Sequence, residues 1–175
     1  LADISAKINF RYDDENFYAA YDVTDDVHYA TDVEPMNIWQ VDGVQTAVVL
    51  YPEDLSAINY IEEFTVALVD GKTEHYRHNT QFQIDNKQIV KNLEVKAVRD
   101  EANKKTYYEI KVPWVDLIPN FRGITPGGYI HLGAVINDND EGDRKGTLDF
   151  NDGPDAMVNR KNWTLFKKVL IGEKE

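Results

Sequence analysis

The stretch "IWQVDGVQTAVVLYP", Ile38 to Pro52, combines two features on which the interpretation of this chain depends. Its second half, Val44 to Tyr51, is an alternating and largely apolar run with the period of a β-strand. Its first half places Trp39 three residues ahead of Asp42, at the entrance to that strand. Trp39 is therefore either a core residue packed under a loop or a flat aromatic surface presented to a ligand.

Strand-like runs continue on both sides of this stretch. Their connections carry Gly, Pro, Asn and Asp, which favour tight turns. Many short strands without intervening amphipathic helices are typical of an all-β fold, and we expect an antiparallel two-sheet β-sandwich, jelly-roll-like in its arrangement. The predicted strands are Ala6–Asp13, Asn16–Val23, Val44–Tyr51, Phe64–Val69, Leu93–Asp100, Thr106–Pro113, Tyr129–Asp138 and Thr164–Ile171.

Two segments differ from this pattern. The run "EDLSAINYIEEF" has a weak helical rhythm, and no other segment has one. The run "KVPWVDLIP" is predicted to leave the sheet at Pro113, because proline cannot donate to a sheet ladder. We expect the apolar side chains that follow to fold back over one end of the core; they are Trp114, Leu117 and Ile118.

Length and composition indicate one globular domain over residues 1–175. A chain of 175 residues, 42% of them hydrophobic, can bury a continuous core, and its start without a signal-peptide pattern fits a domain cut from a larger secreted protein. The net charge of −12 repels phosphate backbones and anionic headgroups, so we expect neither nucleic acid nor membrane as a partner. The chain has no cysteine, which excludes disulfides and thiol nucleophiles.

The chain contains none of the catalytic motifs searched for. It has no G-x-S-x-G, phosphate-binding loop, dinucleotide fingerprint or H-E-x-x-H, and no carboxylate pair stands out for glycoside hydrolysis. The histidines are scattered, and nothing near the "HYRH" pair supplies a third metal ligand. We therefore predict a protein that is not an enzyme and carries no organic cofactor. The histidines are His28, His75, His78 and His131.

Two loops are rich in acidic residues: "DVTDDVHYATD", Asp22 to Asp32, and "NDNDEGDRKG", Asn137 to Gly146. Ca²⁺ takes about six to eight oxygen ligands, and such loops offer them, although the spacing is not that of an EF-hand. The alternative is a solvated, charged turn between strands. The candidate ligands of a structural Ca²⁺ are Asp25, Asp26, Asp138 and Asp140.

Four stretches occur together in one order: "YDDENFYAAYDVTDD", "IWQVDGVQTAVVL", "YYEIKVPWVDLIP" and "GAVINDNDEGDRKGTLDF". In this order and spacing the chain resembles the family 9 carbohydrate-binding modules and the wider DOMON-like group, over most of its length. The resemblance implies a β-sandwich that is secreted and attached to a bacterial polysaccharide-degrading enzyme. It also implies an oligo- or polysaccharide as ligand.

The resemblance also implies roles for individual residues. Trp39 falls on a tryptophan that stacks on the sugar, Gln45 on a side chain that accepts from sugar hydroxyls, and Arg144 on a ligand-contacting arginine. We include Asp42 and Trp163 among the ligand-binding candidates.

Some positions depart from the family's pattern. A second tryptophan closes a sandwich around the terminal sugar in well-known members, but Ala156 or Met157 stands there and Trp163 comes a few residues later. Thr65 and Val135 replace other polar partners. A single aromatic plate with few polar partners predicts weak binding, near millimolar or about −4 kcal/mol.

The leading hypothesis is a non-catalytic module that targets an appended polysaccharide-degrading enzyme to plant or microbial glycan. One alternative is a structural β-sandwich that packs against a neighbouring catalytic domain in the same chain and binds no sugar. A more distant alternative, from the DOMON-like relatives, is a haem domain, which needs an axial pair such as Met36 with a Lys or His on a facing strand.

Overall fold

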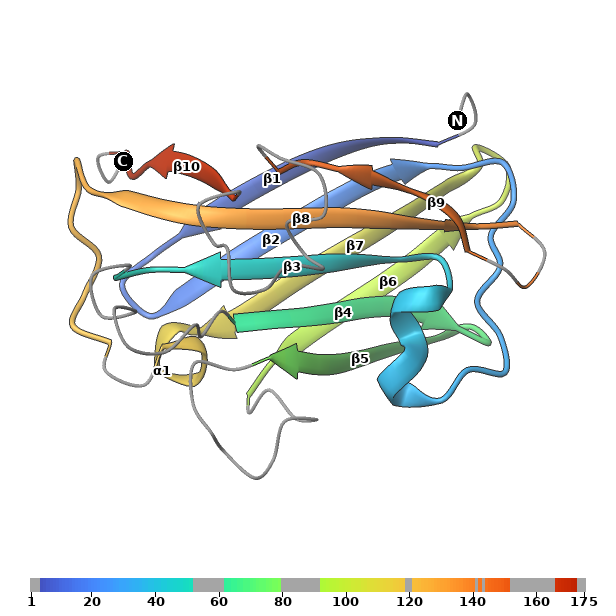
Figure 1. Ribbon diagram of the computed structural model, residues 1–175, viewed down its shortest axis with the longest axis horizontal. Helices are drawn as coiled ribbons and strands as arrows, with labels where there is room; N and C mark the ends of the chain where they lie inside the picture. The colour runs from blue at the N-terminus through green and yellow to red at the C-terminus, as the bar shows by residue number, and fades with distance from the viewer. Residues whose placement is uncertain are drawn as a thin grey trace.

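The computed structural model describes residues 4–51, 62–79, 92–118, 121–140, 142, 144–151 and 166–172. Within these residues two antiparallel sheets pack face to face (Figure 1), which confirms the predicted all-β sandwich. The four-stranded sheet has the order β1-β2-β7-β6, with β1 Ser5–Tyr12, β2 Asn16–Thr24, β7 Lys105–Pro113 and β6 Glu94–Asp100. The six-stranded sheet has the order β10-β8-β3-β4-β5, with β9 also paired to β8. Its strands are β10 Lys167–Leu170, β8 Tyr129–Asn139, β3 Gly43–Val49, β4 Glu62–Val69, β5 Lys72–Asn79 and β9 Arg144–Asp149.

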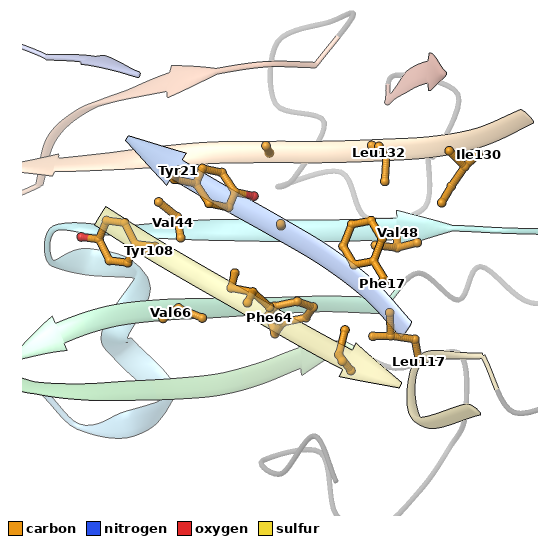
Figure 2. Packing of buried hydrophobic residues seen from close by; sticks show 14 of the residues in the cluster. Phe17, Tyr21, Val44, Val48, Phe64, Val66, Tyr108, Leu117, Ile130 and Leu132 are labelled. Carbon is orange, nitrogen blue, oxygen red and sulfur yellow. The ribbon is translucent and has the colours of Figure 1, made fainter. Parts of the chain in front are cut away.

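The core fills the space between the two sheets. Figure 2 shows the inward side chains, which come from alternate positions along each strand because successive residues of a strand point to opposite faces. Tyr21 of β2 and Thr46 of β3 share a hydrogen bond of 2.7 Å between their side-chain oxygens, so the buried hydroxyl of Tyr21 has a partner in the facing sheet. Each fully buried aromatic or aliphatic side chain stabilises the fold by about 1.5–3 kcal/mol.

A short helix covers one end of the core. Helix α1, Trp114–Leu117, begins directly after Pro113, and Trp114, Leu117 and Ile118 are each at most 1% exposed. Trp114 stacks on Phe121 with 5.6 Å between ring centroids, and its indole Nε1–H donates to the carbonyl oxygen of Asp13 at 3.0 Å. The predicted fold-back after Pro113 is confirmed.

The structure adds elements that the sequence pattern did not predict. Strands β5 and β9 lie at edges of the six-stranded sheet, where exposed and charged side chains replace the apolar alternation by which strands are recognised. The hairpin between β4 and β5 turns at Asp70 and Gly71, whose φ angles of 49° and 75° suit a two-residue turn. Most of the segment with helical rhythm lies outside the described residues. No described helix is long and apolar enough to cross a membrane.

Candidate functional site

Trp39 lies on a 3₁₀ helix rather than directly at a strand entrance. This helix, η1 Pro35–Gln40, lies over the outer face of the six-stranded sheet and contacts β3, β4, β5 and β8 (Figure 1). Pro35 occupies its first turn, where a missing N–H costs nothing. Ile38, 1% exposed, anchors the helix to the sheet, whereas the neighbouring Trp39 is only half-buried. Part of the indole is therefore available to a ligand.

Gln45 lies on the same outer face. It stands on β3 between the inward-facing Val44 and Thr46, and in the sheet it is opposite Thr65 of β4 and Val135 of β8. Its side chain is 6% exposed and donates through Nε2 to Oδ1 of Asn137 at 2.8 Å. A buried amide needs such a partner, and this bond fixes the orientation of Gln45.

Arg144 connects the tryptophan to this amide pair. It begins β9, and its guanidinium carbon lies 4.9 Å from the centre of the Trp39 ring. Its Nη1 donates to the same Asn137 Oδ1 at 3.5 Å. We call Trp39, Gln45, Asn137 and Arg144 the outer-face site. The structure thus brings together three residues predicted from the sequence and adds Asn137, which the sequence reasoning treated only as the start of an acidic loop.

Polar and aromatic groups continue from this site towards β5. The Thr65 hydroxyl and Nε2 of His78 share a hydrogen bond of 2.8 Å, and the ring centroids of His78 and Tyr76 lie 5.0 Å apart. Neither His78 nor Tyr76 was predicted as a site residue. In the sequence, the "HYRH" run that contains them was considered only for metal binding. The pairing of β5 with β4, which places Tyr76 opposite Thr65, is not visible in the sequence.

Asp42 lies beneath the outer-face site and is 3% exposed. Its carboxylate accepts the backbone N–H of Tyr29 at 2.5 Å and that of Asn139 at 2.8 Å. Asn139 in turn donates through Nδ2 to the carbonyl oxygen of Gln40, next to Trp39. Burial raises the pKa of Asp42 to about 8. Asp42 therefore connects the segments that carry Trp39 and Arg144. Its own side chain has little exposed surface for contact with a sugar.

The second aromatic candidate for sugar stacking lies outside the described part of the chain. Trp163, like Ala156 and Met157, lies outside the described residues. Met36, considered as a haem ligand, is 60% exposed on η1.

The predicted calcium ligands largely come together. Carboxylate oxygens of Asp25, Asp26 and Asp140 all lie within 4.8 Å of one another. Asp25 is 3% exposed, and burial, together with the nearby charges of Asp138 and Asp140, raises its pKa to about 6. Hard oxygen donors crowded in this way suit Ca²⁺. A second group, formed by Asp25, His28 and Asp42, meets the same distance limit.

Comparison with known proteins agrees with this architecture. The model of the carbohydrate family 9 binding domain-like family matches residues 1–167, so the chain belongs to this family of carbohydrate-binding domains. No curated protein sequence matches the chain.

Two solved structures share its fold. A family 9 carbohydrate-binding module from Caldicellulosiruptor kristjanssonii in complex with glucose has a TM-score of 0.71 at 15% identity, over 98% of this chain and 79% of that one. A module of the same family and organism in complex with cellotriose has a TM-score of 0.69 at 14% identity, over 98% and 77%.

Proposed function

We propose that the chain is a non-catalytic carbohydrate-binding module and that the outer-face site is its sugar-binding surface. The observation that carries this proposal is the partly exposed Trp39 held against Arg144, which is linked through Asn137 to Gln45. Sugar rings present C–H faces that stack on an indole, while their hydroxyls need planar polar partners. This arrangement supplies both kinds of contact on one surface.

The ligand we propose is a glucose-containing oligosaccharide. The two modules of similar fold were solved with glucose and cellotriose, which makes these the first sugars to test. Because the guanidinium of Arg144 covers part of the indole, a sugar ring would use the remaining surface of Trp39 or displace the arginine. One aromatic plate supports weak binding, about −4 kcal/mol, since association itself costs several kcal/mol.

In a larger protein, such a module would hold an appended polysaccharide-degrading enzyme on its substrate outside the cell. Family membership supports this role. The rival role, a structural domain docked on a catalytic neighbour, would favour one broad apolar surface. Among the described residues the exposed large apolar side chains are instead spread over different elements, with Val98 beside Tyr107 on β6 and β7 and Tyr129 beside Leu170 on β8 and β10.

We also propose that Asp25, Asp26 and Asp140, with the buried Asp138 close by, hold a structural Ca²⁺. Bound Ca²⁺ would relieve repulsion among these carboxylates and fix the loop that leads into Arg144. Chelation should lower the melting temperature, and added Ca²⁺ should restore it. An identical melt with chelator and with Ca²⁺ would contradict the proposal.

The sugar site is tested by calorimetric titration of glucose, cellobiose, cellotriose and xylobiose into the wild type and Trp39→Ala. We expect the variant to lose about 30-fold or more in affinity, as central aromatic contacts do, at a nearly unchanged melting temperature. The matched control is Tyr107→Ala, which removes an aromatic side chain, 41% exposed, from the outer face of the other sheet. Equal losses in the two variants, or unchanged binding in Trp39→Ala, would overturn the assignment.

A further inference from the structure

His28 occupies an unusual position beside the acidic cluster. Its side chain is 10% exposed, and its Nε2 lies 3.2 Å from the carbonyl oxygen of Leu68. A carbonyl oxygen can only accept a hydrogen bond, so Nε2 carries the proton. In the neutral ring the other nitrogen, Nδ1, then presents a lone pair.

His28 Nδ1 lies near the carboxylate of Asp42. Nδ1 has no hydrogen-bond partner among the described residues and lies 3.8 Å from Oδ2 of Asp42, which is too far for a hydrogen bond. Asp25, Asp42 and His28 each offer one ligand atom, a carboxylate oxygen or a ring nitrogen, within 4.8 Å of one another. Acceptors that face one another in a buried place are unfavourable unless a proton or a metal ion lies between them, and 3.8 Å is too long for a hydrogen bond through a shared proton. Metal bonds of about 2.0–2.1 Å at tetrahedral angles separate neighbouring ligand atoms by about 3.4 Å.

We propose that Asp25, His28 and Asp42 bind a borderline divalent metal ion such as Zn²⁺, at a site that adjoins the oxygen-only calcium site. Imidazole nitrogen is a ligand that Zn²⁺ accepts readily, whereas Ca²⁺ takes oxygen. The two sites share Asp25 and differ in their other ligands, His28 and Asp42 here against Asp26 and Asp140 there.

The surroundings of the three ligands suit a metal. Histidines that bind metals usually donate the other ring N–H to a carbonyl or carboxylate, and the Nε2–H of His28 does so to Leu68. The carboxylate of Asp42 is oriented by the backbone N–H groups of Tyr29 and Asn139. Three protein ligands leave a position for water.

A metal at this place would stabilise the segments below the outer-face site. Asp42 is bonded to Asn139, and Asn139 is bonded to the carbonyl oxygen of Gln40 beside Trp39. The metal proposal itself does not depend on sugar binding, because its ligands and its test involve no sugar.

The test is calorimetric titration of Zn²⁺ alone into the full chain stripped with EDTA and dialysed. We expect one Zn²⁺ per chain. His28→Gln should lower the Zn²⁺ affinity about 100-fold and leave Ca²⁺ binding unchanged. Asp140→Asn should weaken Ca²⁺ and leave Zn²⁺ unchanged. The matched control, His75→Gln, removes a half-buried histidine that belongs to neither described acidic group and should change neither titration.

The proposal fails if His28→Gln binds Zn²⁺ as the wild type does. It also fails if Asp140→Asn weakens Zn²⁺ and Ca²⁺ equally, because one oxygen-only site would then bind both ions. If His28→Gln does not fold, the ¹⁵N resonance of His28 Nδ1 in the wild type decides. A large shift on adding one equivalent of Zn²⁺ supports the site, and an unmoved resonance overturns it.

Discussion

The outer faces of the two sheets carry similar kinds of side chain but bury them to different extents. On the four-stranded sheet, oppositely charged groups pair across strands, as Lys111 does with Glu94 at 2.8 Å and Lys105 with Asp22 at 2.7 Å. A shallow hollow of about 660 Å³ lies over this face. On the six-stranded sheet the central polar groups are buried, since Gln45 and Asn137 are 6% and 1% exposed.

This difference supports the proposal that the six-stranded sheet carries the sugar-binding surface. Exposed ion pairs keep an acidic chain soluble and contribute little to its stability. Buried amides cost free energy unless each is hydrogen-bonded in a fixed geometry, so their presence on an outer face calls for a reason beyond solubility. The hollow over the four-stranded sheet is not by itself evidence of ligand binding. The hollow does contain Tyr18 and lies near Tyr107, which makes it the rival surface for a sugar.

The largest expected effect is a change in the free energy of unfolding with pH, caused by buried carboxylates. In the metal-free protein, burial raises the pKa of Asp42 from 3.8 to about 8 and that of Asp25 to about 6. The folded chain then binds more protons than the unfolded chain between about pH 4 and pH 8, so the free energy of unfolding falls as pH rises. We expect a loss on the order of 3 kcal/mol between about pH 5 and pH 8.

This loss is measured by urea unfolding at several pH values in EDTA. Asp42→Asn should flatten the pH dependence, whereas Asp22→Asn, which breaks an exposed ion pair, should leave it in place. Added Ca²⁺ or Zn²⁺ should also flatten it, because metal binding holds the carboxylates ionised. Stability that rises with pH in EDTA would contradict the role given to Asp42.

The next effect concerns the buried amides. Asn137→Ala removes the acceptor of Gln45 Nε2 and Arg144 Nη1, which leaves a buried donor without its partner. We expect a loss of about 2 kcal/mol in the free energy of unfolding, together with weaker sugar binding. Denaturant unfolding measures the loss. Lys111→Met on the other face serves as control and should change neither quantity measurably, and equal effects in both variants would remove the contrast between the faces.

The smallest expected effect is the loss of sugar affinity when the planar guanidinium of Arg144 is replaced by an ammonium group. Arg144→Lys keeps the positive charge but loses the planar guanidinium that lies over Trp39. We expect sugar affinity to fall about three- to tenfold, near 1 kcal/mol, with an unchanged melt. Arg11→Lys, on the outer face of β1, should bind sugar as the wild type does. If Arg144→Lys bound sugar with the affinity of the wild type, only the positive charge of Arg144, and not its planar shape, would contribute to binding.

Much of the fold was predictable because apolar residues recur at every second position in several of the strands. Strands β2 and β7 follow this alternation closely, since one side of each packs into the core, whereas β3 and β8 are buried on both faces along almost their whole length. The edge strand β9 was missed because it is almost entirely exposed, and β5 was missed because its sequence, KTEHYRHN, is polar although Arg77 within it is buried. Helix η1 was missed because a 3₁₀ turn held by one buried residue, Ile38, leaves no periodic signal.

The site was predictable in part. Trp39, Gln45 and Arg144 came from the family resemblance, and the structure places them together. Asn137 was missed because its role depends on the register of β8 against β3, a tertiary fact. Asp42 was predicted as a ligand contact, but its carboxylate accepts the backbone N–H groups of Tyr29 and of Asn139 at the end of β8. Its contact with sugar, like that of Trp163, stays a prediction.

The most direct test of the sugar-binding surface is an NMR titration of the labelled full chain with cellotriose. We predict that shifts concentrate at the indole N–H of Trp39 and at the side-chain amides of Gln45 and Asn137, with the signals of Arg144 following. Shifts confined to Tyr18, Lys96 and Tyr107 on the four-stranded sheet would contradict the account, because the sugar would then bind over the hollow.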